Sequence, residues 1–443
     1  MHTQYSKTIM HKAEVDVMTA APVEVSTATS PSAFDRLQPE WDALLERGES
    51  RIFQTFEWQR TWWRLFGEPN KRARLQIVLV REGGELIGIA PLYIERVTVL
   101  GPVGYRRLSF TGRGVSDYLD LIIERGKEDL VFRHVAGYLA QHKSEFDTVL
   151  LEDIHDGSPS HDRLGAALRA SGFSGDKFLS EYCPRTFLKE SWLDTVATFP
   201  SAHRNRLMKR MRVVTEDFHA EFERVTDLDV VDAAMDDFIR MHQARWNVIG
   251  HQGVFAESTT LQFHREVAPL LMKRGWLLLA FLKMQGKRFV GDYGLIYGSE
   301  CSTYLGGAYD AGEVNRFSPG NVLLMHIMRE CHTLGIRVYD FMRGTERYKY
   351  TLGAVNVPNW TLLMFSHGRF LAPALHKARL LRDALVRRSV HEWSYLLHHA
   401  RKHGFFSRGF ASYVVKRCGT ILADALQKAR EPEKSLVIGR DQK

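Results

Sequence analysis

Hydrophobic and polar positions along the first half of the chain predict a mixture of strands and helices. Apolar and polar residues alternate over 74–81 and 86–97, and the intervening Glu82-Gly83-Gly84-Glu85 is typical of a hairpin turn. Apolar residues at helical spacing predict helices at 40–65, 128–141 and 162–171. Short strands are expected at 107–111, 118–124, 147–153 and 178–189. Helices between strands favour a mixed sheet with helical layers.

The second half repeats this order of elements. Strands are predicted at 218–225, 276–283, 288–297, 301–308, 338–342 and 361–366, and helices at 228–248, 260–273 and 319–334. No short sequence repeat accompanies the duplication. The pattern therefore predicts an α/β (α+β, mixed-sheet) chain of two similar units, each with a twisted sheet covered by helices.

Composition and charge set the outer limits of these units. We predict a disordered leader at 1–32, an N-terminal domain at 33–190, a C-terminal domain at 191–367 and a basic amphipathic helical tail at 368–443. The net charge is +8, but 369–430 alone carries thirteen Lys/Arg against three Asp/Glu, which leaves −2 for the rest. A near-neutral body does not indicate a DNA-binding protein. The tail either docks on an anionic membrane surface or a partner, or packs on the body.

The overall composition is that of an ordinary globular protein, with 44% hydrophobic and 25% charged residues. No apolar run is long enough for a membrane span, and the N-terminus lacks a signal-peptide pattern. The four cysteines form neither a CxxC motif nor a Cys/His cluster, so no zinc site or disulfide framework is predicted. These features favour the cytoplasm, with contact at the inner membrane through the tail as an added hypothesis.

The segment before the helix at 319–334 is the first candidate for chemistry. Ser318 can cap this helix, Pro319 suits its first turn, and Gly320 and Asn321 leave room for a ligand near the backbone N–H groups. A helix start holds anions, so this segment could bind phosphate. The simpler alternative is an ordinary capped helix.

A second candidate follows the strand at 338–342. Within ten residues it combines Arg343 and Lys349, which could hold phosphate or carboxylate, with Glu346, which could take a proton. Tyr348 could donate one. The alternative is a solvated charged loop with internal ion pairs.

Three further groups complete the list of candidates. Asp292 lies between glycines on a predicted strand, and Tyr304 lies on the next strand, so an acid–phenol pair is expected there. Cations at Arg206 and Arg210 share one helix face and could contact a substrate, or form a solvated surface. A helical cluster of His242, Arg245 and Trp246 is also a candidate for substrate binding, and the alternative is that His242 is a structural hydrogen-bonding residue. Motifs of P-loop enzymes, nucleophile-elbow hydrolases and zincins are absent from the sequence.

Several of these stretches together resemble the CelD-type acetyltransferases, a group of the GNAT superfamily linked to cellulose and other exopolysaccharide biosynthesis. The similar stretches are FQTFEW at 53–58, the basic helix at 204–210, MHQARW at 241–246, GDYGL at 291–295, YLGGAYD at 304–310, SPGNVLL at 318–324 and DFMRGTERYKYTLG at 340–353. The resemblance implies a catalytic GNAT fold in the second half and a degenerate copy in the first, a tandem arrangement similar to the Fem-type aminoacyl transferases.

The resemblance also implies a function and a donor. Acyl-CoA, most simply acetyl-CoA, would bind without a metal at the Ser318–Asn321 loop, and the acyl group would pass directly to an amine or hydroxyl of a small-molecule or saccharide acceptor. Glu346 or Asp292 would act as base, and Tyr304 or Tyr348 as acid. The loop lacks one glycine of the common GNAT pattern, so acyl-carrier protein and aminoacyl-tRNA stay open as donors, as does a non-catalytic scaffold.

Overall fold

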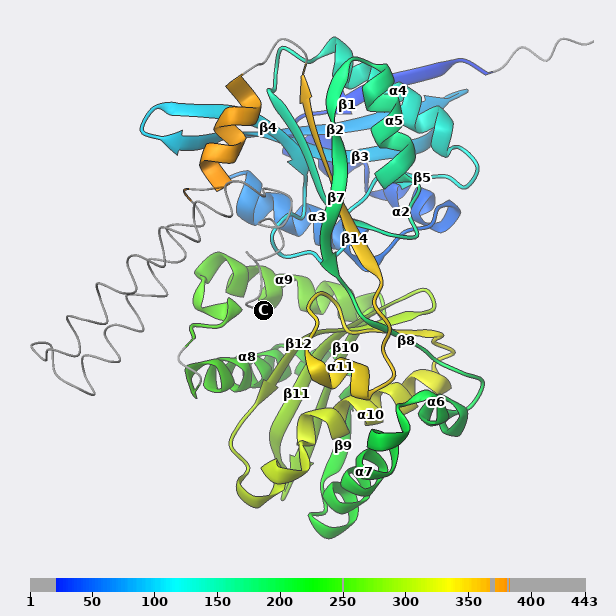
Figure 1. Cartoon of the computed structure of the whole chain (residues 1–443), viewed down its shortest axis with the longest axis vertical. Helices are drawn as coiled ribbons and strands as arrows, with labels where there is room; N and C mark the ends of the chain where they lie inside the picture. Colours follow the sequence, from blue (N-terminus) through cyan, green and yellow to red (C-terminus); the bar gives the residue numbers. More distant parts are fainter. Residues whose placement is uncertain (1–20, 249–250, 367–370, 381, 383–443) are drawn as a thin grey trace, which may run out of the picture.

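The computed structural model describes residues 21–248, 251–366, 371–380 and 382 of the 443-residue chain. Two β-sheets, one above the other in Figure 1, form the centres of two units. The arrangement confirms the predicted mixed α/β fold with two similarly built halves.

The first sheet runs in the order β1-β2-β3-β4-β6-β14-β7, and β5 pairs with β3. Its strands are β1 (Val23–Ala28), β2 (Ala73–Glu82), β3 (Glu85–Leu100), β4 (Val103–Phe110), β5 (Ile122–Ile123), β6 (Thr148–His155), β7 (Phe173–Tyr182) and β14 (Pro358–Ser366). The pair β4–β6 is parallel and the other pairs are antiparallel. The predicted hairpin is confirmed as β2–β3.

The second sheet runs in the order β8-β13-β12-β11-β10-β9. Its strands are β8 (Arg185–Phe187), β9 (Glu221–Val225), β10 (Leu277–Met284), β11 (Lys287–Tyr297), β12 (Glu300–Ala308) and β13 (Val338–Asp340). Only β12 and β13 run parallel, because the helix that joins them carries the chain back across the sheet.

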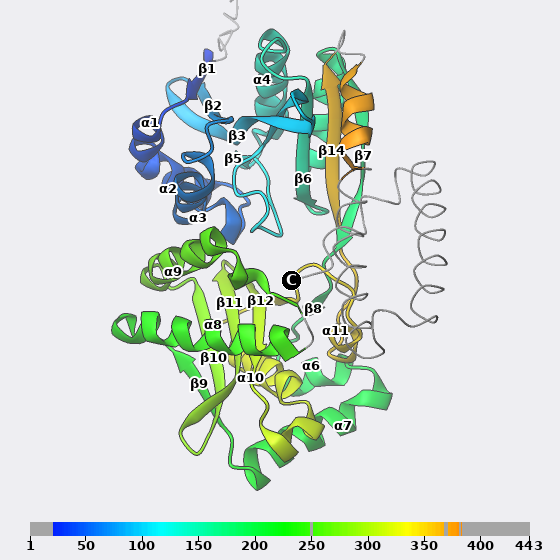
Figure 2. The same ribbon diagram turned by 90° about the vertical axis from the view of Figure 1, so that its left-hand side faces the viewer.

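The helices form layers on both sheets. In the first unit they are α1 (Pro31–Arg36), α2 (Gln38–Arg47), α3 (Phe56–Trp62), α4 (Glu128–Gln141) and α5 (Gly165–Ala170). In the second they are α6 (Trp192–Thr198), α7 (Ser201–Arg212), α8 (Val231–Val248), α9 (Ser258–Lys273), α10 (Pro319–Thr333) and α11 (Arg347–Thr351). Helices α4 and α5 cover the outer face of the first sheet, and α3 packs against α9 between the units (Figure 2).

One apolar core therefore runs through both units. Trp58 of α3 packs against Phe263 of α9 with ring centroids 4.9 Å apart, and against Tyr304 of β12 at 5.8 Å. A separate core lies on the other face of the second sheet, beneath α6, α7 and α10. Because the shared core needs side chains from both units, we expect the two units to unfold together.

The chain exchanges strands between the two sheets. Strand β14 comes after the second sheet in sequence, yet it lies between β6 and β7 of the first. In return β8, which directly follows β7, pairs with β13 at the edge of the second sheet. The two crossing segments also bond to each other, since the Cys183 and Arg185 N–H groups donate to Val357 and Val355 carbonyls at 2.8 and 2.9 Å. The predicted domain boundaries contain no hint of this exchange.

Part of the predicted leader is wrong. Residues 23–28 form β1, which pairs antiparallel with β2, and Pro31 begins α1 with Ser30 as its side-chain cap. The six residues Val-Glu-Val-Ser-Thr-Ala gave too weak a period to be recognised, and the strand is stabilised by its partner. Residues 1–20 lie outside the described part.

The predicted tail lies mostly outside the described residues. Residues 371–380 are helical, and Leu375 packs against Val97, Val99 and Tyr105 of the long β3–β4 hairpin. His376 contacts the Tyr105 hydroxyl at 3.0 Å. This first helical stretch therefore packs on the body. Among the described residues, no helix is long and apolar enough to cross a bilayer.

Buried ion pairs join the units where the strands cross. The side chain of Arg343 is 6% exposed, and it contacts the carboxylates of Asp117 at 2.5 Å and Asp153 at 3.4 Å, each 1% exposed. Burial opposes its charge, but the two carboxylates outweigh this effect and raise its pKa. Arg185 pairs with Asp340 at 2.8 Å, and the Tyr118 hydroxyl donates to Asp340 at 2.6 Å.

Replacing Arg343 by methionine should destabilise the whole molecule. Methionine keeps much of the volume but leaves the buried Asp117 and Asp153 carboxylates without their cation, which typically costs about 3–5 kcal/mol. Chemical denaturation should show this loss in one transition. The control is Arg316→Met, which breaks an exposed pair with Glu313 and should cost at most about 1 kcal/mol. Equal, small losses in both variants would contradict the account.

Candidate active site

The second sheet opens where β12 and β13 separate. They pair at only three positions, the last being Ser302 with Asp340. Strand β12 continues to Ala308, whereas the chain after Asp340 bends away and the Phe341 N–H donates to the Pro184 carbonyl at 2.9 Å. In the described structure no strand pairs with Thr303–Ala308 on this side. The backbone N–H and C=O groups that point away from β11 are therefore available to an extended ligand, apart from the Gly306 carbonyl, which bonds to His242.

The start of α10 lies at the end of this opening. Ser318 has a left-handed conformation with φ of 53°, and its side chain does not cap the helix. A side chain added at the exposed Gly320 would meet nothing within 4 Å, and Asn321 is half-buried beside it. The structure thus leaves open space at a helix N-terminus, where a phosphate can bind.

A buried acid lies beside the opening. Asp292 on β11 is 3% exposed, and it accepts a hydrogen bond from Thr303 of β12, while its Oδ1 has no partner among the described residues. Burial raises its pKa to about 7, and the Thr303 bond only partly opposes this shift. A carboxyl with this pKa can take a proton near neutral pH.

Strand β12 has a bulge at Tyr304. Tyr293 of β11 pairs with Leu305 and the next residue, Gly294, pairs with Thr303, so Tyr304 is the additional residue. Its hydroxyl donates to the Val115 carbonyl of the first unit at 2.6 Å, and its ring packs in the shared core. Asp292 and Thr303 belong to the opposite face of the sheet. The structure therefore does not bring Tyr304 and Asp292 together as an acid–phenol pair.

Tyr348 and Glu346 approach Asp292 from α11. Burial raises the pKa of the Tyr348 phenol, and the carboxylates of Glu346 and Asp292 raise it further, while Arg245 opposes them. These four charged or phenolic groups are thus close enough to influence one another. Glu346 is 53% exposed on its side chain and pairs with Lys349 at 2.8 Å.

Arg245 reaches the opening from the far layer. It is exposed at the end of α8, and a side chain added at Gly306 of β12 would meet its Nη1 at 3.4 Å. Arg245 forms no ion pair within the described residues, so its charge is available to a ligand. Helix α8 packs this closely because Gly307 has no side chain: a Cβ there would lie 2.8 Å from the His242 backbone nitrogen.

The other two helical residues of this cluster anchor α8. His242 is buried, its Nδ1 lies 3.0 Å from the Gly306 carbonyl, and burial lowers its pKa to about 4. The neutral ring therefore donates to Gly306, and Nε2 has no partner in the described structure. Trp246 packs against His242 with centroids 5.9 Å apart, and its Nε1 likewise has no described partner.

Two predicted cofactor-binding cations have internal partners instead. Lys349 is 2% exposed, and its three N–H donors reach the carbonyls of Met342, Arg343 and Gly344 at 2.8 to 3.2 Å. Arg343 forms the buried pairs described above. In this conformation neither side chain has a free donor for phosphate, and their predicted cofactor role stays a prediction.

Arg206 and Arg210 lie on α7, which packs against α10 rather than near the α8 cluster. Arg206 is exposed and bonds to His203 in its own helix, and Arg210 is half-exposed. The structure does not bring them together with His242, Arg245 and Trp246. A substrate contact at both groups would have to span the second unit.

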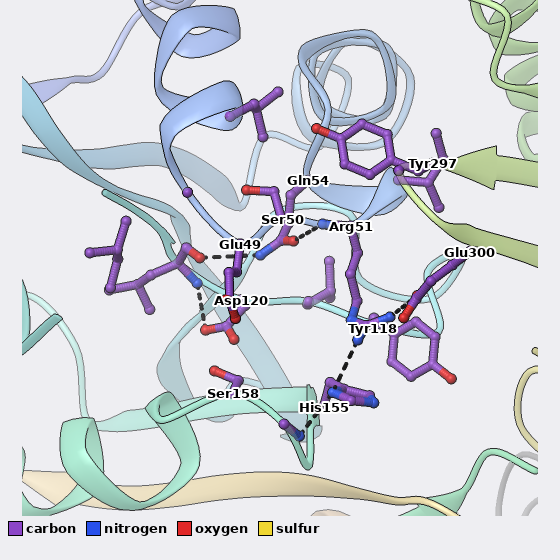
Figure 3. A pocket seen from close by; sticks show the side chains of 18 of the residues that line it. Glu49, Ser50, Arg51, Gln54, Tyr118, Asp120, His155, Ser158, Tyr297 and Glu300 are labelled. Carbon is purple, nitrogen blue, oxygen red and sulfur yellow. Dashed lines mark hydrogen bonds and ion pairs between the residues drawn. The ribbon is translucent and has the colours of Figure 1, made fainter. Parts of the chain in front are cut away.

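The sequence did not predict a cavity between the two units. It has a volume of about 550 Å³ and is lined by Arg51, Tyr118, Asp120 and His155 of the first unit and by the β11–β12 turn up to Glu300 (Figure 3). These residues come from loops far apart in sequence. FQTFEW begins two residues after Arg51, and this was the one nearby signal in the sequence.

Comparisons with known proteins address the second unit directly. Residues 201–350 match the family model described as acetyltransferase (GNAT) domain, and this range includes Asp292, Arg245, Ser318 and Tyr348. Residues 201–350 have a GNAT-type acyltransferase fold. The match covers 150 of the 443 residues. No curated protein matches the chain.

Solved structures extend the similarity to both units. The crystal structure of FemX is 13% identical with a TM-score of 0.53, and the alignment covers 76% of this chain and 96% of FemX. The C-terminal domain of a putative lysylphosphatidylglycerol synthetase from Agrobacterium fabrum is 12% identical with a TM-score of 0.46, covering 77% and 96%. A tandem GNAT protein from the clavulanic acid biosynthesis pathway is 13% identical with a TM-score of 0.38, covering 76% and 98%. At such identities the likeness to FemX concerns the fold.

Replacing Asp292 by asparagine should change how stability depends on pH. The folded protein retains a proton on Asp292 up to about pH 7, whereas the unfolded chain releases it near pH 4. The wild-type free energy of unfolding therefore loses this contribution as pH rises from about 4 to about 7. Relative to wild type, Asp292→Asn should gain stability over that window, by up to roughly 4 kcal/mol, and then level off.

Denaturant unfolding of both proteins at several pH values measures this difference. Asp176→Asn, which alters an exposed carboxylate of β7, is the control and should show no such trend. A constant difference between Asp292→Asn and wild type from pH 4 to 8 would show that Asp292 ionises normally.

Proposed function

We propose that this protein is an acyl-CoA-dependent acyltransferase whose transfer site is the opening between β12 and β13. The observation that carries the proposal is the combination of an unpaired strand edge, an uncapped helix start and a buried carboxyl of pKa about 7. The GNAT-type fold of residues 201–350 supports the same reaction class. Acetyl-CoA is the donor that we expect, without a metal.

The donor would lie along the free edge of β12. The N–H and C=O groups of Thr303–Ala308 that point away from β11, except the Gly306 carbonyl bonded by His242, suit the amide groups of the pantetheine arm, which can continue the sheet as a strand does. The pyrophosphate would then reach Ser318, Gly320 and Asn321 at the start of α10. Arg245 reaches the opening from α8, which lies on the other face of the second sheet from α10. It would neutralise a further anionic group of the donor or the acceptor.

Asp292 fits the role of base better than Glu346. It is buried and unpaired at Oδ1, whereas Glu346 is half exposed and neutralises Lys349. The acceptor nitrogen attacks the thioester carbonyl, the C–S bond breaks, and the proton lost by nitrogen passes to Asp292, directly or through water. The oxygen of the tetrahedral intermediate accepts hydrogen bonds from backbone N–H groups of β12.

Tyr348 would donate a hydrogen bond to the leaving sulfur and keep its proton. Its raised pKa keeps the phenol protonated, so full transfer to a thiolate is unfavourable, while a hydrogen bond to the developing negative charge is favourable. Tyr304 is occupied by the Val115 carbonyl and would shape the site through the bulge. A link to cellulose or exopolysaccharide synthesis, an acyl-carrier-protein donor and a site at the inner membrane stay predictions from the resemblance.

A tRNA-dependent transferase is the second candidate. Helix α7 carries Arg204, Arg206, Lys209, Arg210 and Arg212 and no acidic residue, so it presents a cationic surface on the second unit. Such a surface suits a polyanion. Calorimetry separates the candidates, because the first requires saturable binding of acetyl-CoA and the second does not.

Gly320→Glu should abolish acetyl-CoA binding. The added carboxylate would occupy the open space at the start of α10 and repel the donor phosphates. Gly137→Glu is the matched control, because Gly137 is a helical glycine of α4 that also has nothing within 4 Å of an added side chain. Unchanged affinity in folded Gly320→Glu protein would contradict this placement of the donor.

Asp292→Asn should lower kcat by about 10²–10⁴-fold with little loss of donor affinity. Thiol release from acetyl-CoA, measured with the amine that reacts fastest, provides the rate. Glu346→Gln is the paired variant and should stay within a few-fold of wild type. The reverse order of effects would assign the base to Glu346.

A further inference from the structure

The cavity between the units is open to solvent and is lined by polar and apolar side chains from both. One wall comes from the loop that follows α2 and from the loops around Tyr118 and His155, and the other comes from the β11–β12 turn (Figure 3). At about 550 Å³ it has the size of a small-molecule site. It is separated from Asp292 by the buried contacts of Arg185, Asp340 and Tyr118.

Negative charge dominates the lining. It contains five carboxylates and two guanidinium groups, a formal charge of −3, from Glu46, Glu49, Asp120, Glu128, Glu300, Arg51 and Arg125. Glu300 pairs with Arg51 and with Arg185, and Glu49 lies 3.8 Å from Arg125. Within the described residues Glu46, Asp120 and Glu128 form no ion pair, although His161 and Arg163 act on Asp120 and Glu128 at longer range.

Asp120 is the lining carboxyl whose ionised form a bound cation would stabilise. Burial raises its pKa, although hydrogen bonds from Ser158, Ser160 and the Leu121 N–H (2.7 Å) favour the ionised form. These bonds hold the carboxyl in place beside the cavity but supply no charge. A ligand ammonium group would supply it.

Two further lining atoms are buried and have no described partner, the Ser50 hydroxyl and His155 Nε2. His155 Nδ1 accepts from the Gly157 N–H at 2.9 Å and lies 3.3 Å from Arg51, so the ring proton belongs on Nε2. Burial lowers the pKa of His155 to about 2, which keeps the ring neutral. Both side chains line the cavity, so a rotation of Ser50 or a small shift of His155 would present a hydroxyl and an N–H donor to a ligand hydroxyl.

We propose that this cavity binds a small polyhydroxylated molecule with a protonated amine. The ammonium group lies at Asp120, and hydroxyl groups bond to Ser50 and His155. An anionic ligand is disfavoured, because the guanidinium of Arg51 is already paired with Glu300 and faces the Tyr118 ring at 5.2 Å. The proposal does not depend on acyl transfer.

Calorimetry of the full chain with glucosamine and glucose tests the proposal. The two sugars have the same ring, and glucosamine has an ammonium group where glucose has a hydroxyl. Glucosamine should bind saturably and at least about tenfold more tightly than glucose, because the ammonium forms a charge-assisted bond to a half-buried carboxylate. Asp120→Asn should remove that preference, whereas the control Asp176→Asn, an exposed carboxylate outside the cavity, should retain it.

Three results would overturn the proposal: equal affinity for both sugars, no saturable binding of glucosamine, or an unchanged preference in folded Asp120→Asn protein. Saturable binding of inorganic phosphate that His155→Phe abolishes would assign the cavity to an anion instead. Because acetyl-CoA is absent from these titrations, failure here leaves the acyl-transfer proposal standing, and failure to bind acetyl-CoA leaves this one standing.

Discussion

The position of the chain after β13 is the constraint on which the rest of the structure depends. The buried ion pair of Arg343 with Asp117 and the hydrogen bond from Tyr118 to Asp340 fix this segment against the first unit, and Arg185 of β8 pairs with Asp340 within the second sheet. Asp340 also accepts from the Met342 N–H at 2.7 Å and holds that residue at a φ of 55°, a conformation that non-glycine residues rarely adopt. The segment therefore cannot continue along β12, and the sheet must open there.

Both proposed sites follow from this arrangement. On one side of the buried contacts, the opening leaves β12 with a free edge beside Asp292, Tyr348 and Arg245. On the other side, the same contacts hold the first unit against the β11–β12 turn and enclose the polar cavity. A network of paired charges thus separates a position suited to an anionic donor from one suited to a cationic ligand. The exchange of β8 and β14 between the two sheets connects the two units.

The sequence predicted the fold class and most elements, because strands and amphipathic helices each produce a local periodicity of apolar and polar residues. It could not predict the strand exchange, because β14 has the same apolar pattern whichever sheet receives it. Among the site residues, the structure groups Asp292 with Tyr348 and Arg245, whereas the sequence had paired Asp292 with Tyr304. Lys349 and Arg343 seemed equally suited to phosphate, yet their partners are carbonyls and carboxylates that become neighbours only in the folded chain. The cavity was missed for the same reason, since its lining comes from distant loops.

The central claim is that an acyl-CoA donor extends the second sheet along β12. Hydrogen–deuterium exchange with and without acetyl-CoA measures this directly, because a ligand bonded to the strand edge must slow exchange of the backbone amides that it covers. The account predicts protection confined to Thr303–Ala308 and to the first turn of α10, with the amides of β4 and β6 unchanged. Saturation with acetyl-CoA that leaves Thr303–Ala308 unprotected, or that protects the first unit instead, would contradict it.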